Sequence, residues 1–354
     1  MEFSPSFWTT VLGSFPNQDG KALSEHLIRT LNIPDWPQLP RRTYRENMYV
    51  QYSPSIPAIT ENRNSEKVTF DTTGDLTTRL EGFYEHFLAE DLDAFKLKPE
   101  YAAGFFSMLE AMKAVSTSQS RDVQWIKGQV TGPISFGLTV TDQELRASIY
   151  DELLADVIVK NMAMNARWQV QQLKKVCPNV IIFVDEPYLA SFGSAYINLS
   201  REQVIAMLDE VFTAIHSEKA LAGVHCCGNT DWSVLLATQV DILNLDAYNY
   251  LDYLALYPME IREFLDRGGI VAWGCVPNND EIYKTTPEGL AARLRDGLKL
   301  ICQKAGARGV KISIEEFNNR SLIAPSCGLG STSIEVADRV LKVLTAAGEI
   351  LKQG

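Results

Sequence analysis

The stretch Val180-Ile-Ile-Phe-Val-Asp-Glu-Pro187 decides the fold class of this chain. Its run of apolar, mostly β-branched residues is typical of a strand buried on both faces, and Pro187 ends that strand. An amphipathic helical pattern follows at Arg201–His216, and a second apolar strand is predicted at Ala222–Cys226. Strand, helix and strand in this order indicate a crossover connection between parallel strands.

The same alternation runs along the rest of the chain. Further strands are predicted at Trp8–Leu12, Gln124–Gln129, Val240–Asp246, Gly269–Cys275 and Ser321–Ala324, with an eighth at Lys67–Phe70. Further helices are predicted at Thr77–Ala89, Tyr101–Val115, Gln143–Val176, Ile261–Asp266, Pro287–Ala305 and Ser333–Leu351. Seven or eight strand–helix units in one run predict an α/β protein built as a single (β/α)8 TIM barrel.

The N-terminal part departs from this pattern. Residues 17–59 are rich in proline and include Trp36-Pro-Gln-Leu-Pro40. We expect them to form an irregular loop or small subdomain over the barrel mouth. Because no repeat, low-complexity tract or linker divides the chain, we expect one catalytic barrel domain spanning residues 1–354.

Composition excludes several classes of function. A net charge of −11 argues against nucleic acid as a partner, since phosphate is met by clustered Lys and Arg. No run approaches the roughly 20 apolar residues of a membrane helix, so no membrane association is expected. The N-terminus lacks the pattern of a signal peptide, which favours a cytoplasmic location. In that reducing compartment the six cysteines are expected to remain thiols.

Polar residues follow five of the predicted strands at the point where each strand ends. Catalytic residues of a βα-barrel lie at this C-terminal face, so convergence from several strands indicates an active site there. The residues are Gly13 and Ser14, Asp185 and Glu186, His225 and Cys227, Asp246, and Cys327.

His225 and Cys227 are two residues apart, so on a strand both side chains project to one face, whereas Cys226 points to the other. Cys327, in Pro325-Ser-Cys-Gly-Leu-Gly330, also follows a strand. The three side chains have the chemistry of a zinc site. The alternative, a core histidine with cysteines that act as small hydrophobic residues, fits a lone His-x-Cys better and stays open.

Three protein ligands would leave an open zinc position for a substrate thiol. Coordination removes the thiol proton and so creates the nucleophile at neutral pH. Asp246 is the candidate for a weak fourth ligand, and a hydrogen-bonding role at the strand end is its alternative.

Two further motifs can bind a substrate. A carboxylate of Asp185 or Glu186 can bind an ammonium group, or it can be a solvated or Arg-paired strand end. Backbone N–H groups after Leu12, at Gly13 and Ser14, can hold a carboxylate, or they can belong to an ordinary turn.

Five motifs run in order from the first predicted strand to the last. They are Thr10-Val-Leu-Gly-Ser-Phe-Pro16, Thr131-Gly-Pro133, Val184-Asp-Glu-Pro187, His225-x-Cys227 and Pro325-Ser-Cys-Gly-Leu329. Together they resemble the catalytic domain of cobalamin-independent methionine synthase. They also resemble the wider superfamily that includes uroporphyrinogen decarboxylase and the corrinoid-dependent thiol methyltransferases.

This resemblance implies a (β/α)8 barrel with zinc held by His225, Cys227, Cys327 and a carboxylate. The family's synthases have Glu where this chain offers Asp246. The resemblance also implies that Asp185 contacts the amino group of homocysteine. The carboxylate of homocysteine would then be held by Leu12-Gly13-Ser14.

The chain departs from the folate-dependent synthases in two respects. We expect it to form the catalytic barrel alone, where those synthases have a second, N-terminal barrel. In addition, no histidine follows His225 in this sequence, whereas protonation of the departing folate nitrogen is ascribed to a late histidine in those enzymes. The corresponding stretch here is Gly274–Asn278. A reduced cobalt centre needs no proton to leave. We therefore expect a methylated corrinoid, free or on a partner corrinoid protein, rather than methyl-folate as donor, with homocysteine converted to methionine.

Three alternatives remain. A thiol with a sulfonate group, such as coenzyme M, would need cations, for which Arg41, Arg42 and Arg45 are candidates. A metal-free decarboxylase of the uroporphyrinogen type would need several arginines at the mouth. A non-catalytic zinc-binding or corrinoid-carrier protein would need no substrate chemistry.

Overall fold

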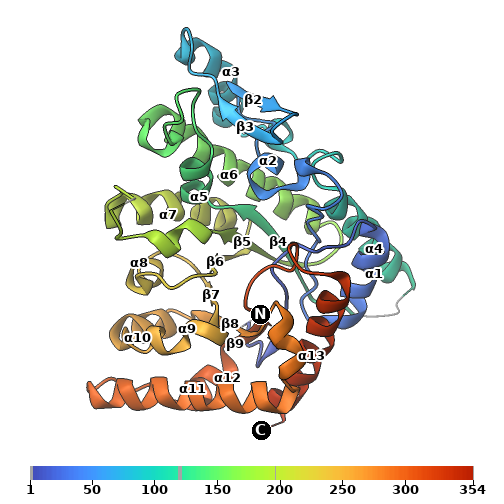
Figure 1. The fold of residues 1–354 in the computed structure, drawn as a ribbon, viewed down its shortest axis with the longest axis vertical. Coiled ribbons are helices and arrows are strands. Elements are labelled where there is room, and N and C mark those ends of the chain that lie inside the picture. The colour runs from blue at the N-terminus through green and yellow to red at the C-terminus, as the bar shows by residue number, and fades with distance from the viewer. Residues whose placement is uncertain (1–2, 119–121, 196, 354) are drawn as a thin grey trace.

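The computed structural model describes residues 3–118, 122–195 and 197–353. Its centre is a curled parallel sheet of seven strands in the order β1-β9-β8-β7-β6-β5-β4 (Figure 1). This confirms the predicted α/β fold of the TIM-barrel type. The strands are β1 Trp8–Thr9, β4 Trp125–Thr131, β5 Asn179–Asp185, β6 Leu221–Cys226, β7 Ile242–Leu245, β8 Ile270–Val276 and β9 Ser321–Pro325.

Residues 33–38 lie between β1 and β4 and complete the barrel as an irregular eighth strand. On one side the Ile33 N–H donates to the Thr9 carbonyl over 3.0 Å. On the other side the Lys127 N–H donates to the Pro34 carbonyl over 2.9 Å. The two prolines of the segment have no N–H group, so a continuous ladder cannot form. The proline-rich composition that predicted a loop therefore belongs to a distorted strand.

One sequence prediction in the N-terminal part was wrong. Lys67–Phe70 is strand β3, but it pairs antiparallel with β2 (Ile59–Asn62) in a hairpin outside the barrel. The segment 17–59, expected to be a loop or small subdomain over the barrel mouth, contains helix α1 (Gly20–Thr30), whose first N–H groups donate to the Asp19 carboxylate. An isolated hairpin strand and a barrel strand share one local pattern, and only the pairing partner distinguishes them.

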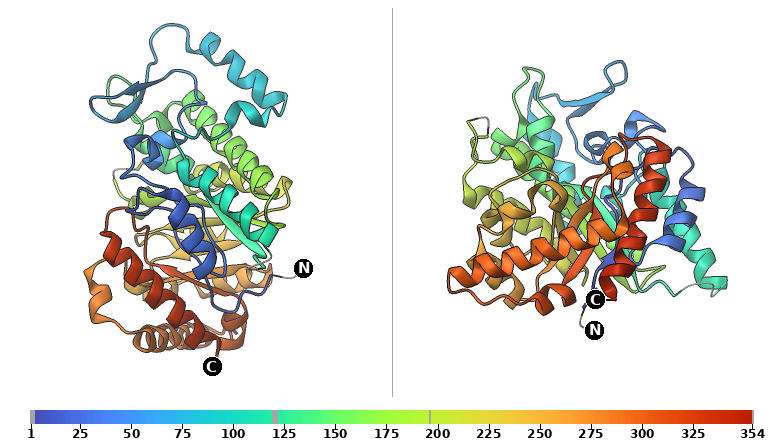
Figure 2. Two further views of the ribbon diagram at one scale, coloured as in Figure 1. Left: turned by 90° about the vertical axis from the view of Figure 1, so that its right-hand side faces the viewer. Right: turned by 60° about the horizontal axis from the view of Figure 1, so that its bottom comes forward.

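Helices surround the sheet, and Figure 2 shows α1, α4 and α13 together on one outer side of it. The hairpin β2–β3 and α3 lie beyond the barrel in Figure 1. None of the helices in the described part of the chain is long and apolar enough to cross a membrane. The other α-helices are α2 Met48–Gln51, α3 Leu76–Leu88, α4 Ala103–Ser118, α5 Pro133–Thr139, α6 Glu152–Leu173, α7 Arg201–Ser217, α8 Trp232–Leu236, α9 Ala247–Leu254, α10 Pro258–Asp266, α11 Pro287–Ala307, α12 Ile314–Asn319 and α13 Ile334–Lys352.

Helix α6 begins later than its periodicity predicts. The pattern indicated a start at Gln143, but the helix starts at Glu152, where the Asp151 carboxylate accepts the N–H groups of Leu153 and Leu154. An aspartate at the N-cap satisfies N–H groups that have no partner within the helix, and this fixes the first turn.

Alternation of side chains along the strands creates two apolar layers. Inward residues of neighbouring strands form a small cluster inside the barrel, and the others pack between sheet and helices. The buried members of the inner cluster are Leu12, Ile33, Ile181, Phe183, Ile242, Ile270, Ala272 and Leu322. On β5 the inward positions are odd-numbered, so the next inward side chain after Phe183 is Asp185, at the end of the strand.

A buried ion pair links the irregular strand to β4. The Lys127 Nζ lies 2.6 Å from an Asp35 carboxylate oxygen, and both side chains are essentially inaccessible to solvent. Burial raises the pKa of Asp35 to about 7, although Lys127 opposes the rise. The Lys127 ammonium also lies over the Phe183 ring, 4.5 Å from its centre. Removal of either charge would leave the other without compensation in the barrel interior.

We predict that Lys127→Met lowers the free energy of unfolding by about 3–5 kcal/mol, because it leaves the Asp35 carboxylate buried and unpaired. Urea denaturation followed by circular dichroism measures this change. The matched control is Lys299→Met, which removes an exposed pair with Asp296 and should leave the free energy nearly unchanged. Equal stability of the two variants would contradict the assigned role of the pair.

Candidate functional site

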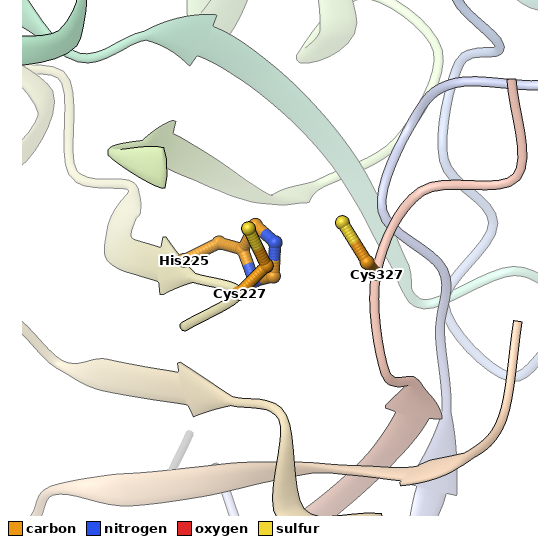
Figure 3. A group of neighbouring side chains, drawn as sticks. All are labelled: His225, Cys227 and Cys327. Atoms are coloured by element: carbon orange, nitrogen blue, oxygen red, sulfur yellow. The ribbon is translucent and has the colours of Figure 1, made fainter. Parts of the chain in front are cut away.

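The three residues expected to share a metal ion lie together at the barrel mouth. His225 is on β6, Cys227 follows that strand directly, and Cys327 follows β9. One ring nitrogen of His225 and the two sulfur atoms lie within 4.8 Å of one another, and Figure 3 shows the side chains facing one another across the mouth. Among the described residues this is the only group of three or more His, Cys, Asp and Glu close enough to hold one ion.

The ring of His225 has one nitrogen in use and one without a partner. Its Nδ1 lies 2.5 Å from the Oδ1 of Asn244 on β7. Its Nε2 is buried and has no hydrogen-bond partner in the described part of the chain. A buried polar atom without a partner is costly, so the free Nε2 fits a ligand for a cation. The donor set of one imidazole and two thiols also fits zinc.

The two thiols differ in acidity. Contact with Cys327, and then with His225, holds the pKa of Cys227 well below its usual value. The same contact raises the pKa of Cys327, so the pair favours one thiolate at Cys227. Cys226 points the other way, as alternation predicts, and its Sγ donates to the Gly228 carbonyl over 3.5 Å. Burial raises the pKa of Cys226 to about 12, so it is an unreactive thiol.

The Asp185 side chain lines the same pocket as the three potential metal ligands. The pocket has a volume of about 390 Å³ and is lined by Asp185, His225, Cys227 and Cys327, together with Ser14 and other residues. Burial raises the pKa of Asp185 to about 6, whereas His225 and Lys127 act in the opposite direction. No described residue forms a hydrogen bond with this carboxylate. It is therefore a partly buried acceptor available to a cationic ligand.

Glu186, the second carboxylate of this motif, does not reach the pocket. It is fully buried, and its oxygens accept the N–H groups of Ile134 and Ser135 over 2.9 and 2.7 Å. A Cβ atom at Gly132 would lie 2.1 Å from the Glu186 carboxyl carbon. The Thr-Gly-Pro and Asp-Glu-Pro motifs thus interlock, and the prediction that Glu186 contacts substrate is replaced by a role at the start of α5.

The loop after β1 lies at the pocket but uses part of its backbone internally. Gly13 has a φ of +67°, and the Ser14 N–H donates to the Leu12 carbonyl over 2.7 Å. Leu12 and Ser14 line the pocket, so the Ser14 hydroxyl rather than its N–H is available to a substrate. A Cβ atom at Gly328 would lie 2.2 Å from the Ser14 Oγ, which explains glycine after Cys327.

Asp246, the expected fourth ligand, lies outside the metal-binding group. Its two carboxylate oxygens accept hydrogen bonds from the N–H and side-chain amide of Asn249, over 3.0 and 2.7 Å. The carboxylate therefore caps helix α9. These contacts agree with the alternative interpretation, in which Asp246 is a hydrogen-bonding group at the strand end.

Sequence reasoning missed Asn244 and several residues of the mouth. Asn244 is a fully buried amide within the apolar strand β7, and this contrast was the available signal. The other missed pocket residues come from the irregular N-terminal part, where no pattern indicated their position: Gln38, Pro40, Glu46, Asn47 and Met48.

Comparison with known proteins was made on both sequence and structure. No family model matches the chain. A methionine synthase from Methanocaldococcus jannaschii is 25% identical over 244 residues, which are 68% of this chain and 69% of that protein. The resemblance to methionine synthase predicted from the motifs is thus confirmed.

Two solved structures share the fold over nearly the whole chain. One is a B12-independent methionine synthase from Shewanella sp. W3-18-1 in complex with selenomethionine, with a TM-score of 0.58 and 17% identity, covering 98% of this chain and 97% of that one. The other is a methyltransferase from Methanosarcina mazei, with a TM-score of 0.57 and 14% identity, covering 99% and 94%. At these identities the likeness concerns the fold.

We predict that Gly132→Ala lowers the free energy of unfolding by about 1–3 kcal/mol, because the new methyl group meets the buried Glu186 carboxylate. Chemical denaturation measures the change. Gly306→Ala is the control, since its methyl group would meet nothing within 4 Å on helix α11. A Gly132 variant as stable as this control would show that the two motifs do not pack as described.

Proposed function

We propose that this chain is a zinc-dependent thiol S-methyltransferase that converts homocysteine to methionine. The observation that carries the proposal is the group of His225, Cys227 and Cys327 in one pocket with the unpartnered Asp185 carboxylate. A methionine synthase among the relatives supports this acceptor.

The residues of the group would hold zinc through the Nε2 of His225 and the sulfurs of Cys227 and Cys327. Zinc bound there would keep a substrate thiol deprotonated at neutral pH. The low pKa of Cys227 favours the ligating thiolate, and the free Nε2 supplies a lone pair without loss of a hydrogen bond. Three protein ligands would leave one coordination position for the substrate thiol.

Asp185 would orient the acceptor by binding its ammonium group. With a pKa of about 6 the carboxylate is mostly ionised at neutral pH, and a bound cation would favour ionisation further. The Ser14 hydroxyl lines the same pocket and can donate to the amino-acid carboxylate. Contacts at both ends of the amino acid would fix the direction of the thiol for in-line methyl transfer.

The distribution of cations disfavours the alternative substrates. No Lys or Arg is among the described residues that line the pocket. The three candidate arginines are already engaged: Arg41 donates to the carbonyls of Gly330 and Ser331 at the edge of the pocket, Arg42 pairs with Glu46 over 2.7 Å, and Arg45 pairs with Glu61 over 2.8 Å. A sulfonate or a polycarboxylate would therefore find no free Lys or Arg among the described residues that line the pocket, which also weakens the decarboxylase alternative.

For the methyl donor we propose a methylated corrinoid, supplied free or by a corrinoid protein. His225 is the one histidine among the described residues of the pocket; its Nδ1 is hydrogen-bonded to Asn244 and its Nε2 is the proposed zinc ligand, so no imidazole is available to protonate an amine leaving group. No comparison supports the corrinoid, and one structural neighbour is a B12-independent synthase. The donor proposal therefore rests on the proton argument alone.

We predict that the purified protein contains one zinc ion and methylates homocysteine with methylcobalamin but not with methyl-folate. Elemental analysis and separate assays with each donor measure this. Cys327→Ser should lose both the metal and the activity, whereas Cys302→Ser, at a half-buried cysteine of α11, should lose neither. Activity without bound zinc would refute the proposal, and activity with methyl-folate alone would refute only its donor.

We predict that Asp185→Asn raises the KM for homocysteine about tenfold or more, because a charge-assisted contact with the ammonium group is lost. The zinc content should stay unchanged. Asp246→Asn is an isosteric control, since that carboxylate already accepts two hydrogen bonds from Asn249, and its KM should equal that of the wild type. An unchanged KM for the Asp185 variant would exclude the assigned contact.

A further inference from the structure

We propose that Asn244 is a positioning residue that holds the His225 ring in the tautomer with its proton on Nδ1. This tautomer leaves the Nε2 lone pair free for the metal ion. The inference rests on the proposed zinc site, but the geometry that carries it belongs to the polypeptide alone.

The geometry is a hydrogen-bonded chain across three neighbouring strands. In the sheet register His225 on β6 pairs with Asn244 on β7, and Asn244 pairs with Ala272 on β8. The side chains follow the same order. The His225 Nδ1 lies 2.5 Å from the Asn244 Oδ1, and the Asn244 Nδ2 donates to the Ala272 carbonyl over 2.7 Å.

The Ala272 carbonyl fixes which end of the amide faces the histidine. A carbonyl oxygen only accepts hydrogen bonds, so it must face the NH2 group of Asn244. If the amide were rotated by half a turn, two oxygens would face each other in a buried site. The Oδ1 therefore faces the His225 ring, and the ring nitrogen next to an acceptor must carry the proton.

The proton on Nδ1 decides the function of Nε2. Asn244 is fully buried and His225 is nearly so. Solvent therefore cannot take the place of Asn244 as the hydrogen-bond partner of the ring. With Nδ1 protonated, the neutral ring presents a lone pair at Nε2, the atom without a partner beside the two thiols. Partners of this kind orient the ring and raise its basicity toward the metal.

The strand itself gives a second reason to assign this role to Asn244. Its neighbours Leu243 and Leu245 are buried, and an amide in such a strand is unfavourable unless its hydrogen bonds are satisfied. One of the two hydrogen bonds of the Asn244 side chain joins it to the His225 ring, and the other joins it to the Ala272 carbonyl, which orients the amide. The described contacts of Asn244 thus converge on the placement of one imidazole.

We predict that Asn244→Leu weakens zinc binding about 10- to 100-fold, because the ring loses the acceptor that selects its tautomer. Competition with a chromophoric chelator measures the dissociation constant. The absorption spectrum of the Co²⁺-substituted protein reports the ligand geometry. Asn244→Asp keeps an acceptor oxygen for the His225 Nδ1, and its protonated carboxyl group can donate to the Ala272 carbonyl in place of the amide, so this variant should restore the affinity and the wild-type spectrum.

The control is Asn165→Leu, which removes another buried asparagine, one that donates to the Phe95 carbonyl on the helical side of the protein. It should lower stability but leave zinc affinity unchanged. Wild-type affinity in Asn244→Leu would overturn the inference, as would an Asp variant that binds zinc as weakly as the Leu variant.

A measurement on the wild-type protein tests the tautomer even where a variant fails to fold. ¹⁵N spectra of the histidine rings in the metal-free protein, at a pH where His225 is neutral, should show the proton on Nδ1. His225→Gln assigns the signals. A proton on Nε2 would overturn the role of Asn244. Failure of the wild type to bind zinc would instead refute the proposed function and leave the tautomer result standing.

Discussion

The register of the parallel sheet is the constraint on which the site depends. Residues paired across neighbouring strands point to the same side, so Asp185, His225, Asn244 and Ala272 occupy one layer at the mouth of the barrel. Below this layer most inward side chains are apolar, and the described polar exceptions are Gln129 and the buried ion pair of Lys127 with Asp35. A shift of one residue in any of these strands would turn its polar group outward against the helices.

The loops above this layer hold one another through close backbone contacts. Glu186 fills the space over Gly132 and accepts the first N–H groups of α5, so a conspicuous carboxylate next to Asp185 has a purely structural role. The turn after Cys327 packs in the same way against Ser14. These contacts fix the loop that carries Asp185 to the start of α5, and the loop that carries Cys327 to the loop after β1. A site built from separate strands needs such precision.

The electrostatics of the mouth follow from where charges are paired. Arg41, Arg42 and Arg45 contact backbone carbonyls, Glu46 and Glu61, respectively. The Asp185 carboxylate, by contrast, has no partner among the described residues. The buried pair of Asp35 and Lys127 lies within electrostatic range and acts on the ionisation of Asp185 from below. Among the described residues of the pocket, the Asp185 carboxylate is therefore the charge available to a ligand. It complements an ammonium group, whereas an anionic substrate would find no free Lys or Arg.

The sequence alone determined the barrel strands from Gln124 onward, most of the helices, and the convergence of His225, Cys227 and Cys327. These features follow from local periodicity and from the rule that parallel strands end at one face. Only the tertiary structure decided that residues 33–38 complete the barrel, that Lys67–Phe70 lies outside it, and that Glu186 and Asp246 are withdrawn from the pocket. Pattern shows which residues are polar or buried, but hydrogen-bond partners distant in sequence decide which polar groups remain free, and only the folded chain brings those partners together.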